Sequence, residues 1–205
     1  MRIWHYTSIK QSEVGGVEKY LLYLNQALTN QGHTVAAGLN CPFVPDIIHT
    51  HGDLMATHKQ LIQNSTTKWI HIFHGTTLAR QLACREYFSL SGWKAGIREF
   101  FLARKAHAGI AVGEHVANEV KRFYFFNKPL VVIKNGVNPQ VFQPIQKITD
   151  SQNILFLGRA NDRVKNIKNI LRACKLVTEG FPDFKLLAAP GIKNAPDFVI
   201  NFGSQ

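Results

Sequence analysis

The sequence predicts an α/β protein in which a parallel sheet with crossover helices is followed by a second, shorter α/β unit. Short runs of β-branched and aromatic residues alternate with amphipathic stretches of helical length, which is the pattern of parallel strands joined by helices. A polar, aperiodic stretch interrupts this alternation once, and the alternation then restarts. The 205 residues are 45% hydrophobic, with 15 Gly and 8 Pro, which excludes a disordered, collagen-like or low-complexity chain.

Six strands are predicted in the first unit, each a short apolar run bounded by turn residues. They cover Arg2–Thr7, His33–Leu39, Asp46–His51, Lys68–His74, Ala108–Val112 and Leu130–Lys134. Apolar residues at helical spacing predict a helix from Val17 to Leu28, which Gly32 ends. Three further helices are predicted at Leu54–Gln63, Trp93–Ala106 and His115–Phe123.

The division between the units is predicted from turn chemistry. Asn135–Gly136–Val137 opens a turn-rich segment, and the residues from 144 to 152 are polar and aperiodic. We therefore expect a first domain at 1–136, a linker at 137–152 and the truncated start of a second domain at 153–205. The second unit is predicted to hold strands Ile154–Gly158, Lys185–Ala189 and Phe198–Phe202 and a helix Asn166–Glu179. Three parallel strands with one helix are thin for an independent core.

The charge balance favours an anionic partner. The net charge is +11, and it divides into +3 for residues 1–100 and +8 for residues 101–205. Nucleotide phosphates, lipid headgroups and nucleic acid all fit such a surface, as does a basic surface that only keeps the protein soluble. Because no helix-turn-helix, zinc-finger or RNA-binding aromatic signature occurs, nucleic acid is not expected as a partner.

Other sequence features indicate a soluble, cytoplasmic protein. No apolar run approaches the roughly 18 residues of a membrane span, and the first ten residues are too polar for a secretory signal. Cys41, Cys84 and Cys174 are odd in number and far apart, which argues against a disulfide framework or a cysteine-based zinc site.

Two elements are candidates for binding phosphate. Gly15 and Gly16 follow the first predicted strand at the entry to a helix, where backbone N–H groups attract anions, although a ligand-free tight turn explains them equally well. Arg159 follows the strand Ile154–Gly158, and Lys165 lies six residues further on near the next helix. In open α/β sheets ligands bind at the carboxyl ends of the strands, where a guanidinium and an ammonium can both bind phosphate oxygens.

Histidines form a third group of candidates. His49 and His51 share one face of a predicted strand, while His71 and His74 lie near the end of the next strand. Zinc binding is disfavoured, because neither pair has a nearby cysteine or the H-E-x-x-H context, and such histidines commonly bond to backbone. His74 precedes Gly75 at the carboxyl end of its strand, where a residue that lines a crevice would lie.

An ordered set of segments resembles a known family. The segments are VGGVEKYLLYLNQALTNQGHTV (14–35), DIIHTHG (46–52), HIFHGT (71–76), AGIAVGEHVANEV (108–120), VIKNGVNPQVFQP (132–144) and ILFLGRANDRVKNIKNILRA (154–173). Together they resemble the retaining, family-4-type glycosyltransferases of the GT-B fold. The resemblance implies two Rossmann-like domains that transfer a sugar from a nucleotide-sugar donor to a glycan or lipid-linked acceptor, without a metal.

The resemblance also implies roles for individual residues. His74, Arg159 and Lys165 would be catalytic, with His74 beside the transferred sugar and the two cations on the leaving diphosphate. The residues that bind donor or acceptor would be Gly15, Gly16, His51 and Asn135.

One part of the family pattern is absent from this sequence. The family has a paired-glutamate motif, E-x7-E, that meets the sugar and the ribose, and no such pair occurs in the 205 residues. We therefore expect the chain to be an N-terminal fragment that neither binds nucleotide-sugar tightly nor turns it over. Two alternatives stay open: a nucleotide-sugar epimerase of the same architecture, and an inactive module that binds the acceptor.

The least family-typical segment, residues 77–128, mixes aromatic with basic residues. Trp93, Phe100 and Phe101 alternate with Lys94, Arg98, Arg104 and Lys105. Such a helix suits an anionic membrane surface or a lipid-linked acceptor, and ordinary core packing explains it equally well. For Phe125 and Phe126, which precede a strand, core packing is the expectation.

Overall fold

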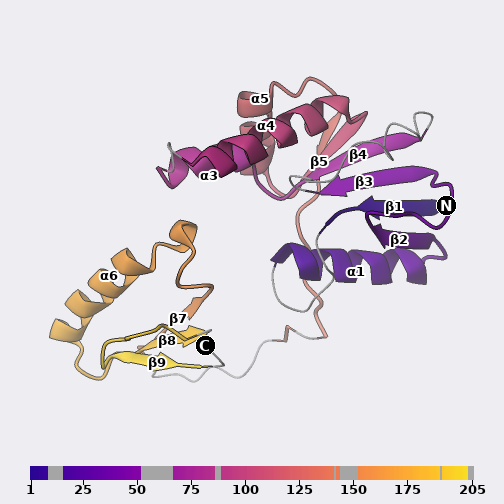
Figure 1. Ribbon diagram of the computed structural model, residues 1–205. Coiled ribbons are helices and arrows are strands. Elements are labelled where there is room, and N and C mark those ends of the chain that lie inside the picture. Colours follow the sequence, from indigo (N-terminus) through magenta and orange to yellow (C-terminus); the bar gives the residue numbers. More distant parts are fainter. Residues whose placement is uncertain are drawn as a thin grey trace. The chain divides into compact units, whose positions relative to one another are not determined.

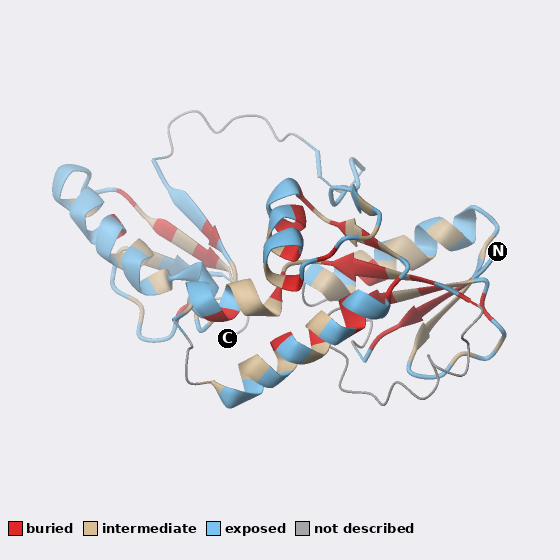
Figure 2. Ribbon diagram, turned by 90° about the horizontal axis from the view of Figure 1, so that it is seen from above, coloured by how far each residue is buried: buried red, intermediate tan, exposed pale blue. Residues whose placement is uncertain are grey.

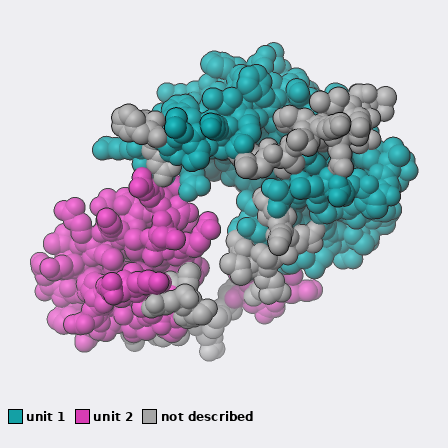
Figure 3. Space-filling view, in the orientation of Figure 1, with its two compact units in different colours: residues 1–137 teal, residues 138–205 magenta. Residues whose placement is uncertain are grey.

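The computed structural model describes residues 1–8, 16–51, 67–85, 89–140, 142–143, 152–189 and 191–202. The chain forms two compact units, Met1–Val137 and Asn138–Gln205, which Figure 3 shows in different colours. Each unit is built from parallel strands and helices, so the predicted α/β class is confirmed. Gly15, the predicted helix Leu54–Gln63 and most of the predicted linker lie outside the described residues.

The first unit contains a six-stranded, wholly parallel sheet (Figure 1). The strand order is β2-β1-β3-β4-β5-β6. The strands are β1 (Arg2–Tyr6), β2 (Thr34–Gly38), β3 (Ile47–His51), β4 (Lys68–Phe73), β5 (Ala108–Ala111) and β6 (Leu130–Val132). All six predicted strands are therefore present, each slightly shorter than the apolar run that predicted it.

Four described helices pack on this sheet, with α1 on one side and the others on the opposite side (Figure 1). They are α1 (Gly16–Asn30), α3 (Thr77–Ala83), α4 (Leu90–Lys105) and α5 (Glu114–Tyr124). The sequence did not predict α3, because seven residues are too few to show a helical period. Its start is stabilised by the Thr76 hydroxyl, which accepts a hydrogen bond from the Ala79 N–H at 3.3 Å.

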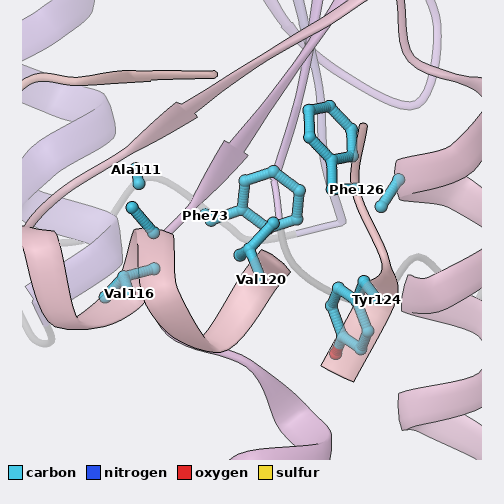
Figure 4. Close-up of a cluster of buried hydrophobic side chains, with 8 residues drawn as sticks. Phe73, Ala111, Val116, Val120, Tyr124 and Phe126 are labelled. Carbon is cyan, nitrogen blue, oxygen red and sulfur yellow. The ribbon is translucent and has the colours of Figure 1, made fainter. Parts of the chain in front are cut away.

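The two faces of the sheet differ in chemistry. The face that includes Trp4, Tyr6, Trp69 and Phe73, here called the aromatic face, packs against buried residues of α4 and α5. Figure 4 shows part of this core, in which Phe73 meets Val120 and Phe126. Histidines from β1 and β3 project from the opposite face, here called the histidine face.

One expectation about the aromatic residues was wrong. Phe126 is core, with 6% of its surface exposed, but Phe125 is 69% exposed. Phe125 ends α5 in the left-handed conformation, with φ of 47°, and this turn directs its side chain outward while Phe126 packs inward.

The second unit contains a three-stranded parallel sheet in the order β7-β8-β9. The strands are β7 (Ile154–Leu157), β8 (Leu186–Ala189) and β9 (Val199–Asn201), and the helix α6 (Ile167–Gly180) follows a 3-10 turn at Arg163–Lys165. Its core includes Phe156, Cys174, Phe184 and Leu186. Figure 2 shows how much of this unit is exposed compared with the central strands of the first unit.

Within the described residues, none of the helices has both the length and the apolar character that a membrane crossing requires.

Candidate functional site

Side chains from three adjacent strands converge at the carboxyl ends of the first sheet. His5 lies one residue before the end of β1, His51 ends β3, and His74 directly follows β4. Because β1, β3 and β4 are neighbours and parallel, their carboxyl ends meet at the same edge. This is the edge at which ligands bind in open α/β sheets.

These three histidines form a continuous line of hydrogen bonds, here called the histidine chain. His5 Nδ1 lies 3.0 Å from His51 Nε2, and His51 Nδ1 lies 3.3 Å from His74 Nε2. The rings of His51 and His74 are stacked, with centroids 5.6 Å apart. Tyr20 of α1 packs edge-on against His74, with ring centroids 4.7 Å apart, so α1 covers the His74 end of the histidine chain.

Burial keeps these imidazoles uncharged. Desolvation, with a smaller repulsion from His49, lowers the pKa of His5 to about 3. Desolvation also lowers the pKa of His74 to about 4 and that of His51 well below its ordinary value, and for His51 the neighbouring histidines add to the shift. An imidazole with such a pKa is neutral at pH 7, with one donor and one acceptor nitrogen.

A second polar group lies on the aromatic face, behind the histidine chain. The indole N–H of Trp69 donates to Thr50 Oγ1 at 2.8 Å, and the same oxygen lies 2.7 Å from His71 Nδ1. Burial lowers the pKa of His71 to about 3. His71 therefore bonds to Thr50 on this face, while His74 bonds to His51.

The segment that carries His74 is tied down by a buried carboxylate. Glu99 of α4 is 2% exposed, and its Oε2 accepts from the Thr77 N–H at 2.9 Å and from the Tyr124 hydroxyl. Thr76 in turn donates to Glu119 Oε2 at 3.1 Å. Gly75 has φ of +154°, which other residues rarely adopt, and this turn leads the chain from β4 into α3. His74 is thus held on a well-anchored turn.

The predicted glycine loop is described only in part. Gly16 begins α1, four residues before Tyr20, and is therefore one helical turn from the residue that covers His74. Within the described part of the chain, no atom lies within 4 Å of the place a Cβ would take on Gly16. None of the described residues therefore blocks the approach of a ligand to this position.

Asn135 is not brought to the histidine chain. It is an exposed residue that follows β6, and β5 separates β6 from β4. Of the residues predicted to bind donor or acceptor in this unit, the structure places His51 beside His74 and leaves Asn135 apart.

In the second unit, the stem of Lys165 lies over the residue that precedes Arg159. The side-chain carbons of Lys165 lie 3.3–3.4 Å from the position that a Cβ on Gly158 would occupy, so the lysine stem runs over this glycine. Gly158 has φ of +153°, and Arg159 follows it directly. The Arg159 side chain is 78% exposed, and its guanidinium lies 3.9 Å from the Asp162 carboxylate. A pair of that length is weak, and most of the Arg159 side chain remains exposed to solvent.

Two residues of this arrangement were missed by sequence reasoning. His5 bonds to His51, and Tyr20 packs against His74. The expectation that the histidines bond to backbone was wrong for His51 and His74, which bond to each other. The alternation of β1 offered a signal for His5, because a parallel neighbour in register places His5 opposite His49.

Comparisons with known proteins agree with this architecture. Residues 42–141 match the model of the family described as Glycosyltransferase Family 4. The chain is similar in structure to sucrose-phosphate synthase (tll1590) from Thermosynechococcus elongatus, with a TM-score of 0.71 and 16% identity over 91% of this chain and 61% of that one. It is also similar to S. aureus MnaA in a co-structure with UDP, with a TM-score of 0.58 and 14% identity over 98% of this chain and 67% of that one.

A search of curated proteins found no match. The chain spans 61% of the length of the sucrose-phosphate synthase, and at 16% identity that likeness concerns the fold. Residues 42–141 are therefore similar in sequence to family-4-type glycosyltransferases, and the chain has the GT-B type of α/β architecture.

Proposed function

We propose that this chain supplies the acceptor-side sheet and the diphosphate-binding loop of an enzyme that transfers a sugar from a nucleotide-sugar to an acceptor, with retention of configuration. The observation that carries the proposal is that the stem of Lys165 lies over Gly158, the residue that precedes Arg159 at the carboxyl end of β7. The family match supports glycosyl transfer, and the UDP bound to the similar MnaA supports a nucleotide donor.

The two cations have a specific task in this reaction. When the bond between the sugar and the diphosphate breaks, its electron pair stays on the diphosphate, which gains a negative charge. Arg159 and Lys165 stabilise that charge more in the transition state than in the bound donor, and this difference accelerates the reaction. Because these side chains already provide positive charge, we propose that no metal is required.

The first unit would hold the sugar and the acceptor. His74 is half-buried on a well-anchored turn, so its ring can bond to a sugar hydroxyl at a fixed position. His51 supports His74 from behind. We propose that Gly15 and Gly16 let the ligand approach the backbone, and that Asn135 contributes from the segment between the domains.

Binding of UDP to the 205-residue chain tests the role of the cations. We expect weak binding, with a dissociation constant above the micromolar range, and amide chemical-shift changes at residues 158–165 in 1H–15N spectra. Arg159→Ala and Lys165→Ala should each weaken the binding of UDP at least about 10-fold, because each removes one charge-assisted hydrogen bond. Lys168→Ala, an exposed cation on α6, is the matched control and should change it less than about two-fold. Equal effects of all three substitutions, or no shift in this loop, would refute the assignment.

Turnover is a separate test. The 205-residue chain is expected to release no UDP from a UDP-sugar by itself, because it has no E-x7-E pair. In an active protein that includes this chain, Arg159→Ala should lower kcat by about 100-fold or more, as loss of a transition-state donor does. The configuration at the anomeric carbon of the product, read from its proton coupling, tests retention.

An exposed stripe on α4 favours an anionic lipid surface as a further partner. Leu90, Ile97 and Phe101 are 77%, 50% and 56% exposed, and they recur at helical spacing. Lys94 lies within the same stripe, and Arg104 and Lys105 are exposed at its end. Apolar side chains flanked by cations suit a headgroup region.

Co-sedimentation with vesicles tests this partner. The chain should bind vesicles that contain phosphatidylserine and not vesicles of phosphatidylcholine alone, and salt should weaken the binding. The double substitution Ile97→Ser and Phe101→Ser should abolish it. Val177→Ser, an exposed apolar residue of α6, serves as the control. Absence of binding at low salt would end the membrane proposal.

A further inference from the structure

The histidine chain is an unusual way to support a residue that meets substrate. His74 Nε2 faces His51, while its other ring nitrogen, Nδ1, stands outside the two hydrogen bonds of the chain. We propose that His5 and His51 are positioning residues that hold His74 as the neutral tautomer with its proton on Nδ1, so that His74 offers a fixed N–H donor to the ligand. The use of that donor rests on the function proposed above.

The histidine chain allows only two arrangements of its protons when all three imidazoles are neutral. A neutral imidazole has one donor and one acceptor nitrogen, and each of the two bonds needs one of each. Once the direction of one bond is set, the other must run the same way. Either all three protons sit on Nδ1, with His5 donating to His51 and His51 donating to His74, or all three sit on Nε2 and both bonds are reversed.

His5, at the other end of the histidine chain from His74, selects between these two arrangements. His5 is 0% exposed, and its Nε2 has no hydrogen-bond partner among the described residues. The reversed arrangement would place an N–H at that position, buried and without an acceptor. Orphaned buried N–H groups are rarer in proteins than buried acceptors without a donor. The arrangement with all protons on Nδ1 leaves only a lone pair there, and it is therefore the favoured one.

The residues around the histidine chain keep its imidazoles neutral. Among the described residues, the titratable groups beside the histidine chain are Tyr20 from α1 and His49 from β3, and His71 of β4 interacts with it electrostatically from the opposite face of the sheet. Burial raises the pKa of Tyr20 and lowers the pKa of His49 to about 4, so neither carries charge at pH 7. His71 is neutral for the same reason.

A fixed tautomer has a consequence for recognition. His74 with its proton on Nδ1 donates to a ligand oxygen and accepts nothing from it at that nitrogen. A hydrogen-bonding site of this kind discriminates against ligands that lack the matching group, because its own polar atom is then left unpaired. His5, which lies one residue before the end of β1, would thus influence which ligand group His74 binds.

The tautomer can be read directly by NMR. We would label the histidines of the 205-residue chain with 15N and record two-bond 1H–15N correlations, which distinguish a proton on Nδ1 from one on Nε2. We expect His74, His51 and His5 all to carry the proton on Nδ1 at pH 7. A proton on Nε2 of His74 in the wild-type chain would overturn the proposal without any variant.

Substitutions test the transmission along the chain. His51→Phe removes both bonds, so His74 should become a mixture of tautomers. His5→Phe removes the selecting end and should also produce a mixture. His49→Phe is the matched control, since His49 shares the strand and face of His51 but makes neither bond, and it should leave His74 unchanged.

Equal changes at His74 in His49→Phe and His51→Phe would show a general packing effect and overturn the proposal. If His51→Phe does not fold, His5→Phe and the wild-type spectrum still decide. The readout requires no nucleotide and no activity, so its failure is distinguishable from failure of the proposed function.

Discussion

In each unit a strand is followed by a glycine with a positive φ angle, but the residue beside that glycine is in a buried cluster in one unit and exposed in the other. In the first unit, His74 is followed by Gly75, with φ of +154°, and in the second, Arg159 is preceded by Gly158, with φ of +153°. His74 belongs to a buried hydrogen-bonded chain, whereas the Arg159 side chain is 78% exposed. Burial favours the neutral form of an imidazole, which then has one donor and one acceptor nitrogen. Exposure leaves a guanidinium charged and accessible to an anion. The same turn can therefore support two kinds of chemistry.

The sheets that carry these turns also differ in how well they are covered. In β4 of the first unit, Trp69, Ile72 and Phe73 are all buried, so both of its faces are covered. In β7 only Phe156 is buried, while Leu155 and Leu157 are 56% and 65% exposed. The central strands of the first unit are thus better shielded from water than β7 of the second unit.

Acid should destabilise the first unit alone. The pKa is about 3 for His5 and His71 and about 4 for His49 and His74 in the folded state, against about 6.5 when unfolded. Below pH 6.5 the unfolded state binds more protons than the folded state. The free energy of unfolding should therefore fall by about 1.4 kcal/mol per pH unit for each such histidine, down to about pH 4. The second unit has no histidine.

Separate probes can follow the two units in the whole chain. All three tryptophans lie in the first unit, so their fluorescence reports its unfolding in guanidinium at pH 7, 6 and 5. Cys174 is buried in the second unit, and its reaction with 4,4′-dithiodipyridine reports the other transition once Cys41 and Cys84 are replaced by Ser. Parallel losses of stability in both units would contradict the prediction.

Core truncation should cost more in the first unit than in the second. Phe73 is 0% exposed and lies among side chains of α5 and the segment after it (Figure 4). Phe73→Ala should lower the free energy of unfolding by about 3–5 kcal/mol, because rigid neighbours leave a cavity. Phe156→Ala should cost less, since the loosely covered second unit can close around the gap. Denaturant midpoints from the same two probes measure both, and equal costs would remove the contrast.

The buried carboxylate Glu99 should contribute an intermediate amount. Glu99→Leu leaves the Thr77 N–H and the Tyr124 hydroxyl without their acceptor, and we expect a loss of about 1–3 kcal/mol. Glu99→Gln keeps an acceptor oxygen and should lose less. Glu179→Leu, at an exposed position of α6, is the matched control and should change stability by less than about 0.5 kcal/mol. A loss in Glu179→Leu as large as that in Glu99→Leu would contradict this ranking.

The smallest effect is expected on the exposed face of β7. Leu155→Lys should change the stability of the second unit by less than about 1 kcal/mol and should reduce association of the chain at high concentration, because β7 is an apolar edge strand. Light scattering and the Cys174 probe measure these two quantities. Ile72→Lys, at a 1% exposed position of β4, should instead prevent folding of the first unit.

The fold was largely predictable because its elements follow periodic patterns. Each strand is a short apolar run, and α1, α4 and α5 have apolar residues at helical spacing. The predictions were wrong where the local sequence pattern is weak. The helix α3 has only seven residues and is held by Thr76 and Glu99, and Phe125 faces outward because of a left-handed turn. Glu99 lies 22 residues from Thr77, so the local sequence around α3 does not reveal this partner.

For the candidate site, the sequence by itself determined the chemical groups and the strand ends that carry them. His74, Gly75, Arg159 and Lys165 can be found by their position after apolar runs, since the strand period and the turn residues are local properties. Only the tertiary structure decided that His5 and His51 join His74 in one hydrogen-bonded chain and that the Lys165 stem lies over Gly158. The physical reason is strand order: β1, β3 and β4 are separated in sequence, and their parallel pairing brings the three imidazoles within hydrogen-bonding distance and removes His5 and His51 from water.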